Sequence, residues 1–173
     1  SFPTRRSSDL LVQAIGISNA VAIASGAFNT MAVRSDGMVY GVGYNTSGQL
    51  GDMSLTVRST YVQAIGISNA VAIGNGYQYS IALRADGFVY GTGDGTNGQL
   101  GNNSTGLRVT FAQAIGISNA VAINCAGNYH TLAVRSDGLV FASGRNNRGH
   151  LGTNDQTDYS TFVQAIGISN AVA

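Results

Sequence analysis

The chain has 173 residues, of which 24 are glycine, 44% are hydrophobic and 10% are charged. An average domain is about 25% charged and about 7% glycine, so this chain is poor in charge and rich in glycine, while its single proline keeps it short of a disordered composition. One cysteine excludes an intrachain disulfide framework, and a net charge of +1 argues against electrostatic binding to nucleic acid or anionic lipid.

The first ten residues, SFPTRRSSDL, match the in-frame translation of a common sequencing-library adapter. We therefore expect residues 1–10 not to be native, and we exclude them from the fold prediction. Without them the net charge is zero. The apolar stretch that follows imitates a secretory signal peptide, but the same stretch recurs inside the chain, which indicates structure. The native N-terminus is expected to lie outside this sequence.

A block of ten residues, QAIGISNAVA, occurs four times. Its copies begin 50, 50 and 51 residues apart, at Gln13, Gln63, Gln113 and Gln164. Periods of about fifty residues are typical of solenoids and propellers, in which each unit buries its faces against its neighbours.

Within one period, four short apolar or alternating segments are predicted strands: 21–25, 30–34, 38–43 and 60–65. An Asp-Gly pair separates the second strand from the third, and this dipeptide favours a two-residue type I′ turn. No segment shows a helical pattern with caps. Four antiparallel strands in each period predict an all-β β-propeller, with blades at about 21–65, 71–115 and 121–166.

Three segments that follow the second predicted strands resemble repeats of the regulator of chromosome condensation family: 36–51, 86–101 and 137–152. The segment GNYHTLAV, at 127–134, is similar to another part of that repeat, and the resemblance covers residues 11–173. WD and kelch repeats fit less well, since the chain has neither a Trp-Asp pair nor a double glycine. The chain departs from the family where it has Val42, Thr92 or Ser143 in place of the usual tryptophan.

The resemblance also implies a size for the whole ring. Propellers of this family typically close with seven blades, so about three blades of an incomplete ring are expected here. Residues 11–15 would be an outer strand of a preceding blade, and residues 170–173 would begin a following one. We therefore expect the chain to be a fragment that self-associates through open blade faces.

The glycines of two recurrent turns are interpreted as structural. In the Gly-Gln-Leu-Gly turn, the glycines supply backbone conformations that a side chain forbids, and Leu50 or its counterpart anchors the loop. The residues with this structural role are Asp36, Gly37, Gly48, Gly51, Asp86, Gly87, Gly98, Gly101, Asp137, Gly138, Gly149 and Gly152.

The turns of an antiparallel blade divide between two faces. The face with the Asp-Gly and Gly-Ile-Ser-Asn turns has the same sequence in every copy, whereas the turns of the opposite face differ between copies. Binding residues usually lie on variable loops held by a rigid scaffold, and tyrosine and arginine dominate protein interfaces. The candidate binding residues on the variable face are Tyr44, Tyr77, Tyr79, Tyr129, His130, Arg145 and Arg148.

Other reactive residue types are interpreted as structural. His130 is expected to make a structural hydrogen bond, and His150 to serve turn chemistry, because no third ligand stands at a metal-site spacing. Cys125 is expected to be an inert thiol. The arginines at positions 34, 84 and 135 are expected to form a solvated ring, and Asn45 and Asn103 each begin a triplet that fits a glycosylation acceptor.

These features favour a non-enzymatic scaffold that binds a protein partner through the variable face. We expect no cofactor, metal, nucleic-acid partner or membrane insertion, since no apolar run reaches membrane length and no nucleophile–base pair stands out from the repeat. The resemblance fits bacterial members best, which favours an extracellular or surface location. The alternative is the role that gives the family its name, guanine nucleotide exchange on a small GTPase with chromatin association.

Overall fold

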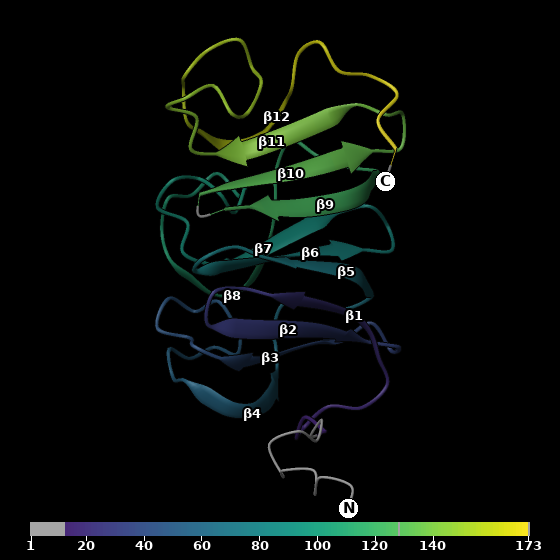
Figure 1. Cartoon of the computed structure of the whole chain (residues 1–173), viewed down its shortest axis with the longest axis vertical. Coiled ribbons are helices and arrows are strands. Elements are labelled where there is room, and N and C mark those ends of the chain that lie inside the picture. The colour runs from purple at the N-terminus through teal and green to yellow at the C-terminus, as the bar shows by residue number, and fades with distance from the viewer. Residues whose placement is uncertain (1–12, 128, 173) are drawn as a thin grey trace, which may run out of the picture.

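The computed structural model describes residues 13–127 and 129–172, so the predicted adapter segment lies outside the described residues. The described residues form three four-stranded antiparallel sheets, which lie one after another along the long axis of the molecule (Figure 1). The all-β class and the four-stranded blades are therefore confirmed. No helix of the described part is long and apolar enough to cross a bilayer.

Each blade uses four consecutive strands in sequence order. The first contains β1 (Ala20–Ser25), β2 (Asn29–Arg34), β3 (Val39–Gly43) and β4 (Arg58–Gln63). The second contains β5 (Ala70–Asn75), β6 (Tyr79–Arg84), β7 (Val89–Gly93) and β8 (Arg108–Gln113). The third contains β9 (Ala120–Ala126), β10 (His130–Arg135), β11 (Val140–Gly144) and β12 (Tyr159–Gln164). The strands β1, β5 and β9 bring neighbouring blades into contact.

The fourth strand of a blade lies two residues earlier than its pattern predicts. β4 spans Arg58–Gln63, and Arg58 pairs with Gly43 on β3. Ala64 and Ile65 leave the ladder, because their N–H groups donate to the carbonyls of Val39 and Gly51. Their apolar character reflects contacts at the end of the blade rather than strand pairing.

The Asp-Gly hairpin is not the predicted type I′ turn. Such a turn needs two residues at positive φ, whereas only Gly37, at 78°, has positive φ in this loop. The Gly37 N–H donates to the Arg34 carbonyl and the Arg34 N–H to the Met38 carbonyl, so the loop has three residues. A Cβ on Gly37 would stand 2.7 Å from the Cα of Asn69 in the next blade. The position therefore requires glycine because of both its φ angle and its neighbour.

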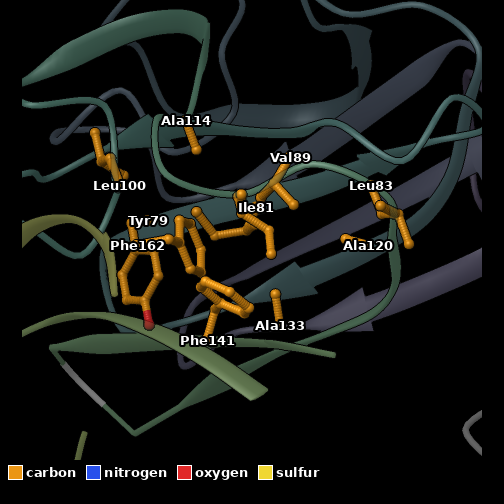
Figure 2. Close-up of a cluster of buried hydrophobic side chains, with 11 residues drawn as sticks. Tyr79, Ile81, Leu83, Val89, Leu100, Ala114, Ala120, Ala133, Phe141 and Phe162 are labelled. Atoms are coloured by element: carbon orange, nitrogen blue, oxygen red, sulfur yellow. The ribbon is translucent and has the colours of Figure 1, made fainter. Parts of the chain in front are cut away.

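The apolar core lies between blades rather than inside one. One cluster joins the second blade to the third around Tyr79, Ile81 and Phe141 (Figure 2), and another joins the first blade to the second around Met31, Leu50 and Phe111. A single four-stranded sheet cannot enclose apolar side chains by itself, so each blade depends on its neighbour.

The Gly-Gln-Leu-Gly turns connect consecutive blades through backbone carbonyls. The Ser80 hydroxyl donates to the Gln49 carbonyl at 2.8 Å, and the Thr131 hydroxyl donates to the Gln99 carbonyl at 2.7 Å. The leucine of each turn is buried. A Cβ on Gly48 would stand 2.6 Å from the Arg108 carbonyl oxygen. These turns hold the long loops of one blade against the sheet of the next.

Candidate functional site

The variable face is formed by the loops that follow β1, β3, β5, β7, β9 and β11. Strand direction alternates in each sheet, so these loops emerge on one side of the blades and the Asp-Gly turns on the other. Six of the seven candidate binding residues of this face lie in two surface groups, and the seventh is buried.

The first group, which we call the aromatic cluster, consists of Phe28, Tyr44 and Tyr77. The Phe28 ring meets Tyr44 edge to face at 6.0 Å and Tyr77 at 6.3 Å between centroids. The three side chains border a hollow of about 520 Å³, whose lining also includes Gly43, Val57 and Gln78. Phe28 is 64% exposed, although it is the most apolar of the three. The sequence analysis missed Phe28, although a large apolar residue inside a variable turn was a signal for it.

The second group, which we call the basic hollow, lies in the third blade. Its volume is about 360 Å³, and its lining comprises Gly127, Tyr129, His130, Arg145, Asn147, Arg148 and His150. The Arg145 guanidinium stacks over the Tyr129 ring at 5.4 Å from its centroid. The imidazoles of His130 and His150 lie 4.5 Å apart between centroids. Four of the candidate binding residues therefore line one hollow, and His150, which the sequence analysis assigned to turn chemistry, lines it as well.

The exception is Tyr79, for which an exposed binding role is wrong. Its side chain is 0% exposed, and its hydroxyl donates to the His130 carbonyl at 2.5 Å. Tyr79 is the first residue of β6, where its ring lies in the core between the second and third blades. Burial raises the pKa of its hydroxyl well above the ordinary value. The residue joins two blades and is not available to a partner.

Comparison with known proteins identifies the repeat. Residues 20–49 and 120–149 match the model of the regulator of chromosome condensation (RCC1) repeat. Two segments of the chain therefore match RCC1 repeats. Comparison of the sequence with curated proteins finds no match.

Solved structures of RCC1-like propellers share the fold. Human WBSCR16 is similar at 20% identity and a TM-score of 0.73, over 84% of this chain and 37% of that protein. Prp20p from Saccharomyces cerevisiae, studied for its binding to Gsp1p and histones, is similar at 19% identity and a TM-score of 0.75, over 86% of this chain and 39% of that protein. The yeast RCC1 (Prp20) bound to Kap60 is similar at 20% identity and a TM-score of 0.74, over 86% of this chain and 37% of that protein. This chain thus spans less than two thirds of each of them, and the likeness at these identities establishes the fold.

A buried asparagine organises the long loop that follows β3. The Asn45 side-chain carbonyl accepts from the Leu50 N–H at 2.9 Å, and its amide nitrogen donates to Asp52 at 2.8 Å. Asn45 is 0% exposed, so its interpretation as a glycosylation acceptor is wrong. Asn146 makes the same bond to Leu151 in the third blade, at 2.9 Å. The sequence analysis missed this structural role of Asn45 and Asn146. The presence of asparagine at the same position in two blades was the available signal.

The same loop contains a charged pair that fixes its shape. Asp52 lies 2.7 Å from the Arg58 guanidinium. Burial alone would raise the pKa of the Asp52 carboxyl, but hydrogen bonds from Ser54, Arg58 and Asn45 lower it below its ordinary value. The carboxylate is therefore charged at neutral pH and ties the loop to the start of β4.

The recurrent arginines on the opposite face are paired rather than simply solvated. Each makes an ion pair of 2.6–2.7 Å with the aspartate of its own Asp-Gly turn: Arg34 with Asp36, Arg84 with Asp86, and Arg135 with Asp137. Each also stacks on an aromatic ring of the adjacent strand, at 4.8–5.4 Å from the ring centroid. Their repetition therefore reflects blade structure.

No group of three His, Cys, Asp or Glu side chains that could hold a metal ion occurs within 13–127 and 129–172. Burial raises the pKa of the Cys125 thiol to about 12. The thiol is therefore protonated at neutral pH and a poor nucleophile.

The His130 side chain does not make the structural hydrogen bond that the sequence analysis predicts. In the described part of the chain its imidazole makes no hydrogen bond, and it packs on the His150 ring instead. Burial, followed by the neighbouring His150, lowers the pKa of His130 below the ordinary value of 6.5. The protonated form of His130 is therefore unfavourable in the folded state.

Acidification is expected to destabilise the protein through His130. Because its pKa is lower in the folded state, the unfolded chain binds the proton more tightly, so stability is retained above pH 6.5 and lost as the pH falls through the folded pKa. His130→Asn, which introduces the residue that the first blade has at this position, should reduce this loss. Urea unfolding at about pH 7.5 and about pH 5 measures the difference. An identical pH dependence in wild type and variant contradicts this account.

Proposed function

We propose that the chain is a non-enzymatic RCC1-type scaffold that binds a protein partner through its variable face. The observation that carries this proposal is the aromatic cluster, three rings exposed together around one hollow on loops that the blades hold in place. Aromatic side chains bury large areas at interfaces and lose little conformational entropy in doing so.

The rigidity of the surrounding loops supports this proposal. The Tyr44 N–H donates to the Phe28 carbonyl at 2.9 Å, which ties the loops after β1 and β3 together. The Asn45 and Asp52 bonds fix the rest of the longer loop. A preorganised apolar surface binds with a small ordering cost.

The double variant Phe28→Ala/Tyr77→Ala tests this function. Affinity capture with the wild-type chain, followed by quantitative mass spectrometry, should identify a partner whose affinity for the double variant is at least roughly tenfold weaker. Both side chains are substantially exposed, so the thermal midpoint should change little.

A matched control makes the same kind of change on the opposite face. Ile115 is exposed there, and Ile115→Ala should retain the partner. A partner that the double variant retains, or that both variants lose equally, contradicts binding through the aromatic cluster.

A second candidate is guanine nucleotide exchange on a small GTPase, with chromatin association. Its support is the likeness to Prp20p, which was studied for its binding to Gsp1p and histones. If the captured partner is a small GTPase, release of a fluorescent guanine nucleotide separates the two functions. Accelerated release on addition of the chain favours the exchange function, and unchanged release favours the scaffold.

A further inference from the structure

The basic hollow gathers positive groups that have no carboxylate partner in the described structure. The arginines that do form ion pairs are Arg34, Arg58, Arg84 and Arg135. Neither Arg145 nor Arg148 forms an ion pair with any described residue, yet both line this one hollow. The chain's two histidines line it as well, and none of its lining residues is acidic. The guanidinium charges of Arg145 and Arg148 in one concavity favour an anion there.

The acidic residues of the same loop are engaged elsewhere. Asp155 accepts hydrogen bonds from Tyr159 at 2.8 Å and from Thr153 at 2.8 Å. Asp158 accepts the Asn146 N–H at 2.6 Å. These bonds leave the guanidinium groups of the hollow available to a ligand from outside.

The Arg145 geometry suits a carboxylate. Its guanidinium lies over the face of the Tyr129 ring, so the ring supports the plane while the N–H groups at the edge stay available. A planar guanidinium with free edges can bind a carboxylate through two parallel hydrogen bonds. The Asn147 side chain in the lining offers a further amide donor.

Resting on the proposed function, we infer that the basic hollow binds a carboxylate side chain from an acidic segment of the protein partner. The hollow, at about 360 Å³, has room for a single acidic side chain. The described residues contain seven arginines and no lysine, and four of the arginines are neutralised within the chain, so no extended basic surface exists to follow a phosphate backbone. A protein segment is therefore the favoured source of the anion.

A labelled hexaglutamate peptide, titrated with the whole chain and followed by fluorescence anisotropy, tests this inference. The peptide should bind, and binding should weaken as salt is added. The double variant Arg145→Gln/Arg148→Gln should bind at least roughly tenfold more weakly, because each charged hydrogen bond contributes about that factor. Its thermal unfolding should match that of the wild type.

The control variant is Arg108→Gln. Arg108 is exposed, lies outside the hollow and forms no ion pair with the described residues, so this change removes one positive charge without altering the site. Hexaglutamate binding should remain close to that of the wild type. An equal loss in Arg108→Gln and in the double variant overturns the inference, since it reduces the effect to net charge.

Two competitors separate the possible sources of the anion. A hexaglutamine peptide should not bind, and inorganic phosphate and a short oligothymidylate should compete weakly. Equal binding of hexaglutamine, or tighter binding of phosphate or oligothymidylate than of hexaglutamate, overturns the inference. Failure of hexaglutamate to bind also overturns it but leaves the proposed function intact if Phe28→Ala/Tyr77→Ala still loses its partner.

Discussion

Tyr79→Ala is expected to lower the free energy of unfolding by about 3–5 kcal/mol, the range for removal of a buried aromatic ring. The ring is fully buried in the cluster that joins the second and third blades, close to Ile81 and Phe141 (Figure 2). Its loss leaves a cavity between the two sheets. Denaturant unfolding of the two proteins measures the difference.

Two further variants separate the causes. Tyr79→Phe keeps the ring and removes the hydroxyl that bonds to the His130 carbonyl, so it should cost only about 1–3 kcal/mol. Tyr77→Ala, two residues earlier and exposed, should cost less than either. Equal stability of Tyr79→Ala and Tyr77→Ala shows that the ring does not join the blades.

Gly116→Ala is expected to lower the free energy of unfolding by about 3 kcal/mol or more. Gly116 has a φ of 88°, which costs other residues about 1–2 kcal/mol. A Cβ there would also overlap the carbonyl oxygen of Phe162 in the next blade, and forced overpacking costs about 1–3 kcal/mol more. The change therefore strains both the turn and the joint between blades.

The repeat supplies its own control for this experiment. Gly167 occupies the same position in the following copy, with a φ of 79°, but no described atom lies within 4 Å of a Cβ placed there. Gly167→Ala should therefore cost only the backbone part, about 1–2 kcal/mol. Thermal unfolding of both variants isolates the contribution of the blade joint. Similar losses in the two contradict it.

The strands and blades could be predicted because their signals are local and repeat three times. The turn type could not, because Asp-Gly fits both a two-residue and a three-residue loop. The pairing of Arg34 with Met38 and the approach of Asn69 decide between them. These contacts depend on the strand register and on the next blade, so the Asp-Gly dipeptide alone cannot predict the turn type.

The candidate site shows the same limit. Comparison of the copies identifies the variable loops, and most of the tyrosines and arginines selected there gather in two surface groups. The prediction for Tyr79 was wrong because its ring is buried against side chains of the third blade, and its hydroxyl bonds to the His130 carbonyl, 51 residues away. The copies have Asn29, Tyr79 and His130 at one strand position, so the alignment shows variation there but not the direction of each side chain.

The hydrogen bonds between blades recur with the period of the sequence. The Gly37 carbonyl of one Asp-Gly turn accepts the N–H of Ala70, which begins the second blade, and the Gly87 carbonyl accepts the N–H of Ala120, which begins the third. The Gly138 carbonyl accepts the Ala171 N–H in the same way. Because both halves of this joint lie in the constant part of the repeat, a complete unit can be duplicated, deleted or exchanged with every joint preserved. Recombination between the nearly identical blocks can therefore produce new combinations of surface loops, one blade at a time, without redesigning the frame that presents them.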